Sequence, residues 1–238
     1  MGAVIVRPSR RLAGRAVALV LAVLGGAALA ACSSAGGAGA DGAASPGAAS
    51  PSAGRTDPTA GSTSFAVVGD SITDANSPDL AGGDLGSESW AAYAVEAGAD
   101  FVGGWAEWGA PTSYMADSVT AVDADVLVVL AGTNDLAFGV PFDESAANLD
   151  RIVATVGIDD VVVSSIPPSD AFPEAATQFN EQLEALADDR GWRFVDASAG
   201  LRTAEGRFAD GMSYDGLHPS EQGARVLGEA IAAELLAG

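Results

Sequence analysis

Short apolar runs alternate with longer amphipathic stretches from about residue 65 to residue 236. The short runs hold five to seven residues, and their apolar positions are contiguous, as is typical of strands buried on both faces. The run at 125–131 is the clearest, because Val and Leu fill it almost without a polar break. Strands are therefore predicted at 65–69, 99–103, 125–131, 160–165 and 192–196.

The stretches between the strands have helical patterns, and they predict helices at 89–98, 112–122, 142–156, 173–190 and 220–236. Asp143 is expected to cap the third helix, while Gly157 and Gly191 follow the third and fourth as stop signals. This alternation predicts an α/β fold with a parallel sheet covered by helices on both faces. In such sheets the active groups lie beyond the carboxyl ends of the strands, here at 69–73, 103–111, 132–135 and 165–169.

The first 31 residues have a different pattern, in which an arginine-bearing start leads into the apolar stretch 16–31. This is the pattern of an export signal, and about 16 apolar residues are too few for a membrane span, which needs about 20. Its end, Leu29-Ala30-Ala31-Cys32, resembles the bacterial lipobox. The resemblance implies cleavage before Cys32 and a lipid on that cysteine, which would anchor the protein to the outer face of the cell membrane. An ordinary signal peptide with secretion is the alternative, and the export route stays open.

Residues 32–62 are dominated by Ala, Gly, Ser, Pro and Thr and show no apolar periodicity. Such a segment cannot bury enough apolar surface to offset the entropy of an ordered backbone, so it is predicted to be a flexible linker. A random chain of that length spans roughly 30 Å. One folded domain is predicted at 63–238, where the strand and helix patterns lie.

Charge and residue counts exclude several classes of function. The chain holds 32 acidic and 11 basic residues, for a net charge of −21 and a pI near 4.1. This negative field argues against nucleic acid as a partner. The single cysteine and single histidine leave no Cys-based metal site and little for zinc, although counting leaves carboxylate-only sites open. We expect no metal and no cofactor, and a monomer.

Nucleophilic catalysis is the chemistry that the strand ends favour. Ser71 follows the first predicted strand, and a serine hydroxyl needs a base because it is a poor nucleophile at its own pKa. If the base is a histidine it must be His218, and Asp215, three residues ahead across a glycine, can orient its ring. Asn134, after the third strand, offers a side-chain amide for an oxyanion.

Three motifs occur in register with the strand pattern, and together they resemble the SGNH (GDSL-type) hydrolase family: Gly69-Asp70-Ser71-Ile72-Thr73, Gly132-Thr133-Asn134-Asp135 and Asp215-Gly216-Leu217-His218-Pro219. The resemblance covers residues 64–238 and implies a single-domain three-layer α/β/α sandwich with a five-stranded parallel sheet in flavodoxin-like order. It also implies that Ser71 is the nucleophile, His218 the base and Asp215 its orienting acid.

The same resemblance implies an oxyanion hole made by the Ser71 backbone N–H, a glycine N–H and the Asn134 side chain. That glycine belongs to the poorest matching block, 103–112, where Gly109 is favoured and Gly104 is the alternative. Asp70 and Asp135 are expected to be structural hydrogen-bonding residues. Trp105 and Trp108 are expected to pack rather than to line a pocket, and Trp90 and Trp192 to lie in the core.

The expected function is hydrolysis of acyl esters on a small molecule or polysaccharide. Two alternatives remain: an O-acyltransferase or deacetylase acting on a cell-envelope polysaccharide, and a non-catalytic surface-binding lipoprotein. Pocket walls are expected from the segments 74–88 and 167–173, whose conformation the sequence does not determine, so the acyl and alcohol parts of the substrate stay open.

Overall fold

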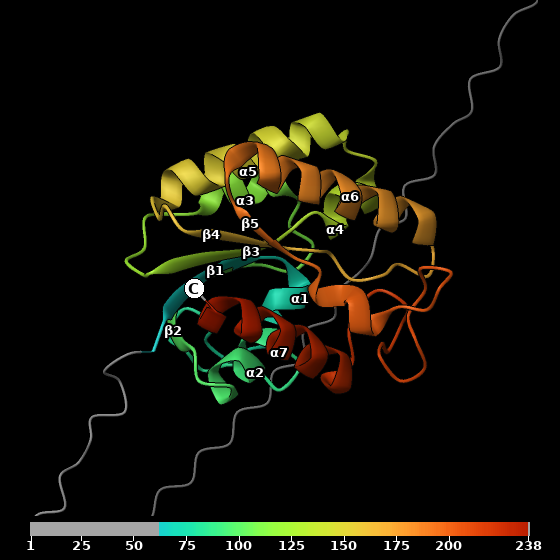
Figure 1. The fold of residues 1–238 in the computed structure, drawn as a ribbon, viewed down its shortest axis with the longest axis horizontal. Helices are drawn as coiled ribbons and strands as arrows, with labels where there is room; N and C mark the ends of the chain where they lie inside the picture. The colour runs from blue at the N-terminus through green and yellow to red at the C-terminus, as the bar shows by residue number, and fades with distance from the viewer. Residues whose placement is uncertain (1–61, 238) are drawn as a thin grey trace, which may run out of the picture. The chain divides into compact units, whose positions relative to one another are not determined.

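A computed structural model describes residues 62–237, so the predicted signal segment, Cys32 and nearly all of the predicted linker lie outside the described residues. Its five strands form one all-parallel sheet in the order β2-β1-β3-β4-β5 (Figure 1). This confirms the predicted α/β class and the flavodoxin-like order. The strands are β1 (Ser64–Gly69), β2 (Asp100–Ala106), β3 (Val126–Leu130), β4 (Val161–Ser164) and β5 (Arg193–Val195).

Helices cover both faces of the sheet, which completes the three layers (Figure 1). On one face lie α3 (Thr112–Ser118), α4 (Thr133–Phe138), α5 (Phe142–Val156) and α6 (Pro173–Arg190). On the other lie α1 (Ser71–Asp74), α2 (Trp90–Glu96), the short 3₁₀ helix η1 (Ala197–Leu201) and α7 (Glu221–Ala237). Within 62–237, no helix combines the length and the apolar character that crossing a membrane requires.

The contiguous apolar runs are explained by two separate cores, one on each face. Along β3, Leu127 and Val129 pack against α3, α5 and α6, whereas Val126 and Val128 pack toward α2 and α7. Successive side chains of a strand point to opposite faces, so a strand covered on both sides needs an apolar residue at every position. Trp90, predicted to be core, is fully buried in the second cluster.

Several boundaries differ from the prediction. The second strand continues to Ala106 because it pairs with β1 along its whole length, with Gly69 opposite Ala106. The helix expected at 112–122 ends at Ser118, since Val119 is extended and packs into the first core cluster. The cap of α5 is Pro141, so the prediction of Asp143 was wrong, and Asp143 lies in the first turn instead.

Candidate active site

Ser71 is the first residue of α1, directly after β1. Asp70 caps this helix, because its Oδ1 accepts a hydrogen bond of 3.0 Å from the backbone N–H of Ile72. Gly69 makes the tight strand-to-helix turn possible, since a Cβ there would lie 2.2 Å from the Oγ1 of Thr73. The local sequence thus presents the Ser71 hydroxyl at the carboxyl edge of the sheet.

His218 lies just before α7 and faces Ser71. Its Nε2 is 3.0 Å from the Ser71 Oγ, and its Nδ1 is 2.8 Å from Oδ2 of Asp215. The other carboxylate oxygen of Asp215 accepts from the backbone N–H groups of Leu217, at 3.0 Å, and His218, at 2.8 Å. Partial burial acts to raise the pKa of Asp215, but the hydrogen bonds from His218 and from these N–H groups hold it below its ordinary value. The carboxylate is therefore charged and fixes the orientation of the imidazole.

Trp108 lies beside this pair, contrary to the expectation that it only packs. Its indole and the His218 ring have centroids 5.1 Å apart, and its Nε1 donates to Asp74 at 2.6 Å. Glu88 closes the same side and accepts a hydrogen bond of 2.8 Å from the Tyr214 hydroxyl. Between them remains a narrow cleft of about 20 Å³, lined by Ser71, Ile72, Ala75, Glu88, Trp108, His218 and Pro219.

Asn134 lies in the first turn of α4, and its side-chain amide nitrogen donates two hydrogen bonds to residues near Ser71. The Nδ2 atom donates to Oδ2 of Asp70 at 3.1 Å and to the carbonyl of Ala110 at 3.2 Å. Asp70 precedes Ser71, and Ala110 follows Gly109. The structure therefore brings the segments of Ser71, Gly109 and Asn134 together at one edge of the sheet.

The two candidate glycines of the second block have different positions. Gly104 lies inside β2, in register with Val67, and a Cβ on it would be 2.1 Å from the Val67 carbonyl oxygen. It allows the close approach of the two strands, two residues before the end of β2. Gly109 lies beyond β2, directly after Trp108, and its φ is +72°. Of the two, only Gly109 belongs to the loop that reaches the Ser71–His218 pair.

Asp70 is fully buried, and burial raises its pKa from 3.8 to about 7. The hydrogen bond from Ile72, the charge of His218 and the hydrogen bond from Asn134 oppose this rise without overcoming it. A carboxyl with two acceptor bonds and no basic side chain bonded to it is thus held between α1 and α4.

Asp135 and Trp105 have structural roles, as the sequence predicts. The carboxylate of Asp135 is fully buried and accepts from the Thr112 backbone N–H at 2.8 Å and from the Ser145 hydroxyl at 2.8 Å, so it links α3, α4 and α5. The Trp105 ring packs edge-on against Tyr114 with centroids 5.7 Å apart and contacts the first core cluster.

A cavity of about 180 Å³ lies next to the Asp215–His218 turn. Its walls come from the start of α4, from the segment after β4 and from the turn itself, and Asp215 and Leu217 are among them. The segment after β4 is held at both ends: Asn180 of α6 bonds both backbone groups of Ile166, at 2.8 and 3.0 Å, and the Asp170 N–H donates to the Gly216 carbonyl at 2.9 Å.

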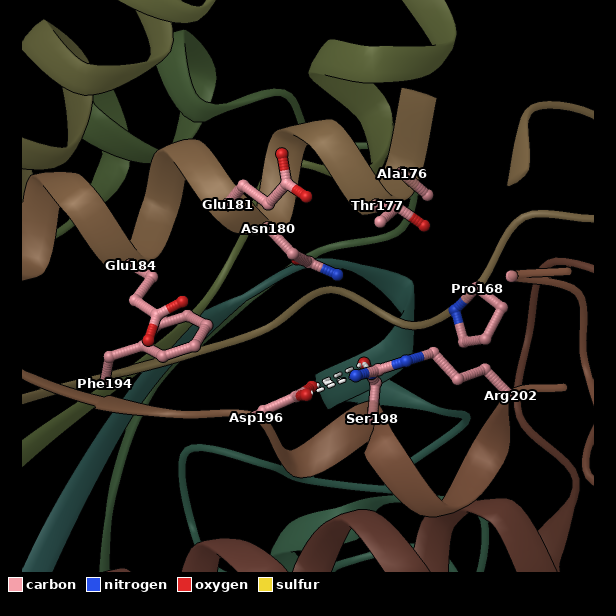
Figure 2. Close-up of a pocket in the computed structure, with 11 residues that line it drawn as sticks. Pro168, Ala176, Thr177, Asn180, Glu181, Glu184, Phe194, Asp196, Ser198 and Arg202 are labelled. Atoms are coloured by element: carbon pink, nitrogen blue, oxygen red, sulfur yellow. Dashed lines mark hydrogen bonds and ion pairs between the residues drawn. The ribbon is translucent and has the colours of Figure 1, made fainter. Parts of the chain in front are cut away.

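A larger cavity of about 390 Å³ lies between α6 and the end of β5 (Figure 2). Its polar groups bond largely to one another or to the backbone. The Arg202 guanidinium pairs with Asp196 and also donates to the Ser198 hydroxyl at 3.0 Å. None of Ser71, Asp215 and His218 lines it. Its lining is Pro168, Ala176, Thr177, Asn180, Glu181, Glu184, Phe194, Asp196, Ser198, Arg202 and Gly206.

Several solved structures share this fold at low sequence identity. An acetylxylan esterase from Geobacillus stearothermophilus, solved as a catalytic mutant, matches with a TM-score of 0.58 at 20% identity, covering 74% of this chain and 95% of that one. A GDSL-like lipase from Bacteroides thetaiotaomicron matches with a TM-score of 0.54 at 18% identity, covering 73% and 87%. A G-D-S-L family protein from Desulfitobacterium hafniense matches with a TM-score of 0.58 at 16% identity, covering 72% and 98%.

A search of curated protein sequences finds no significant match to this chain. The model of the GDSL-like Lipase/Acylhydrolase family matches residues 67–226, which is most of the chain and spans Ser71, Asn134, Asp215 and His218. The chain therefore belongs to the GDSL-like lipase/acylhydrolase family and is a serine ester hydrolase.

Proposed function

We propose that Ser71, His218 and Asp215 form the catalytic triad of an acyl-ester hydrolase at the cell envelope. The observation that carries this proposal is the continuous pair of contacts, 3.0 Å from Ser71 Oγ to His218 Nε2 and 2.8 Å from His218 Nδ1 to Asp215. Asp215 holds the proton on Nδ1, so Nε2 is free to accept the proton of Ser71 as its Oγ attacks the ester carbonyl.

The attack turns the carbonyl oxygen into an oxyanion, which needs donors placed in advance. We assign these to the backbone N–H groups of Ser71 and Gly109 and to the Nδ2 of Asn134. Both hydrogen bonds of that Nδ2 are made within the protein, to Asp70 and Ala110. To donate to an oxyanion, Nδ2 must therefore give up or share one of these two hydrogen bonds. The charged carboxylate of Asp70 then competes with the oxyanion for the Nδ2 donor.

Collapse of the tetrahedral intermediate breaks the bond to the alcohol oxygen, and His218 returns its proton to that oxygen as the alcohol leaves. Water then enters, gives a proton to His218 and attacks the acyl carbon on Ser71. The second collapse releases the carboxylic acid and restores the Ser71 hydroxyl. No metal or cofactor takes part in this scheme.

Replacing the proposed nucleophile tests the proposal directly. We expect Ser71→Ala to lower kcat on a p-nitrophenyl ester by about 10³-fold or more, on the scale of triad deletions in other serine hydrolases. Ser113→Ala, an exposed serine on α3, is the matched control and should keep full activity. Undiminished turnover by Ser71→Ala would contradict the assignment of Ser71 as nucleophile. Absence of turnover by the wild type, together with failure of a fluorophosphonate probe to label Ser71, would instead favour the non-catalytic binding function.

The proposed location rests on the lipobox-like segment before Cys32. We infer that a lipid on Cys32 anchors the enzyme to the outer face of the cell membrane. Mass spectrometry of the mature N-terminus checks this: a diacylglyceryl cysteine supports the anchor, and an unmodified N-terminus contradicts it. Cys32→Ser should move the protein from the membrane fraction to the medium.

A second candidate function uses the same residues on an envelope polysaccharide. The enzyme would either remove acyl groups from its sugar hydroxyls, as a deacetylase, or transfer acyl groups to them, as an O-acyltransferase. This candidate is favoured by Trp108, which is half exposed beside His218, because an exposed aromatic face suits a sugar ring. The acetylxylan esterase among the similar folds acts on an acylated polysaccharide, as its name states. Incubation with an acyl donor and a glycan separates the options: free acid indicates hydrolysis, and an acylated glycan indicates transfer.

A further inference from the structure

The 180 Å³ cavity next to the Asp215–His218 turn is built by three segments that are far apart in the sequence. The first turns of α4 form one wall, the segment after β4 forms another, and the turn before α7 forms the third. All three lie at the carboxyl edge of the sheet, where Ser71 also lies. The apolar side chains in these walls are Leu136, Ala137, Ile166, Pro167, Ala171, Phe172 and Leu217.

The cavity adjoins the proposed reacting groups through three residues. Asp215 lines it and binds the His218 ring at 2.8 Å, and Leu217 immediately precedes His218. Thr133, on the opposite wall, immediately precedes Asn134. The narrow cleft under Trp108 shares no lining residue with this cavity. Two distinct spaces therefore lie at this edge of the sheet: the cleft, which Ser71 and His218 line, and the cavity, which Asp215 lines.

The cavity suits a hydrocarbon better than a sugar. Its carboxylates are already engaged within the protein: Asp215 with His218, and Asp170 with the backbone N–H of Phe208 at 2.9 Å. The Thr133 hydroxyl on the cavity wall is buried and has no hydrogen-bond partner within residues 62–237, so it could bond one hydroxyl of a ligand. A sugar carries several hydroxyl groups, and burying the others without partners costs free energy. An alkyl chain would instead bury against Ile166, Leu217 and their neighbours.

We propose that this cavity receives the acyl chain of the ester and that it selects chains of about four to six carbons. This inference rests on the proposed function of Ser71. The cavity volume is about 180 Å³, and an apolar protein cavity of roughly 150 Å³ holds benzene, a ligand of about six carbons. An acetyl group would leave most of this space unfilled, whereas a butyryl to hexanoyl chain fills it. The alcohol part then lies on the side of Trp108.

A series of p-nitrophenyl esters from acetate to octanoate measures the selection. We expect kcat/KM to rise by up to roughly fourfold per added methylene as far as hexanoate, and then to level or fall. A profile that is highest at acetate overturns the inference. If Ser71 is labelled by a fluorophosphonate but the profile is flat, the inference fails alone, whereas absence of all turnover and labelling removes the proposed function as well.

Narrowing the cavity tests whether these walls cause the preference. Ala137 and Ala171 are both exposed at its edge, so larger side chains there need not disturb the core. We expect Ala137→Phe and Ala171→Phe each to lower the ratio of hexanoate to acetate kcat/KM by at least tenfold. Ala147→Phe, at an exposed position of α5 outside the cavity, is the matched control and should leave the ratio unchanged.

A second set of substrates shows whether the cavity binds the acyl part or the alcohol part of the ester. Butyrate esters of alcohols of increasing size vary only the leaving group. The two narrowing variants should rank these alcohols as the wild type does. If their kcat/KM instead changes with the alcohol and not with the acyl chain, the cavity holds the alcohol and the assignment is wrong. Where a variant fails to fold, the wild-type chain-length profile still decides.

Discussion

Asp70 is a single buried carboxyl that serves two helices. One oxygen accepts from the backbone of α1 next to Ser71, and the other accepts from Asn134 at the start of α4. Its charged form strengthens both bonds but is disfavoured by complete burial, which raises its pKa to about 7. The same residue therefore positions two groups of the proposed site and makes the protein sensitive to pH.

The pH dependence of stability has a defined sign. Between the ordinary pKa of 3.8 and the folded value of about 7, an unfolded chain has lost the Asp70 proton while the folded protein keeps it. The free energy of unfolding contributed by Asp70 therefore falls as pH rises through this window and stays low above it.

Asp70→Asn removes this titration. The substitution also alters the hydrogen bond with the Asn134 amide, but the free energy of that change does not depend on pH. We expect the variant's free energy of unfolding, relative to wild type, to rise between pH 5 and pH 8 by up to about 3 kcal/mol. Urea denaturation at both pH values measures it, and pH 5 stays above the pI of 4.1. A constant difference between the two proteins would show that Asp70 does not titrate in this range.

At the residue scale, the sequence could predict the pairing of Ser71 with His218 because the chain has only one histidine, which narrows the choice of base. Trp108 could not be predicted. Its place over the His218 ring depends on the loop between β2 and α3, where no periodic pattern exists, and on a hydrogen bond to Asp74. Nothing local separates it from Trp105, which packs three residues earlier.

The helix α4 has only six residues, yet it carries Asn134 of the proposed site and part of the cavity wall. Its N-cap is Gly132, whose φ is +122° and whose Cβ, if present, would lie 2.3 Å from the Phe179 ring. Only glycine fits that turn, so the ring of α6 sets the position of Asn134 and of the cavity wall behind it.

Gly132→Ala should therefore reduce both stability and turnover. We expect a loss of roughly 3 kcal/mol or more from overpacking and backbone strain together. Gly139→Ala, at the other end of α4, also has a positive φ of +69°, but its Cβ would meet no atom within 4 Å. This control should lose only about 1 kcal/mol. Thermal denaturation and kcat measured on both variants check the pair, and equal losses would contradict the steric cause.

Among the helices, the bounds could be predicted where the helix is long and where a glycine marks its end. The bounds of α5 and α6 were predicted in full, because each ends at a glycine in the left-handed conformation and has an apolar stripe long enough to recognise. None of the short helices α1, α4 and η1 was among the predicted helices. Helices of four to six residues have too few turns for a periodic signal, so tertiary contacts decide their conformation.

For the whole molecule, a net charge of −21 on 238 residues means that folding brings like charges together. Screening this repulsion should stabilise the folded state, so Tm is expected to rise as potassium chloride is increased from 0.05 to 0.5 M. Sucrose at matched osmolality is the control for effects that do not depend on charge. A Tm that falls with salt would indicate that attractive ion pairs, such as Arg193 with Asp160 and Glu234, outweigh the repulsion.

The hydrogen bond from Asp170 to Gly216 joins a wall of the acyl cavity to the turn that carries Asp215 and His218. This bond couples the surface proposed to set substrate preference to the turn that carries the proposed general base. Rebuilding the segment after β4 to admit bulkier substrates would shift the general base as well. Broader specificity obtained there would come with slower turnover, whereas changes at Ala137, the exposed cavity residue of α4, leave both this hydrogen bond and Asn134 in place and offer the better route for directed evolution.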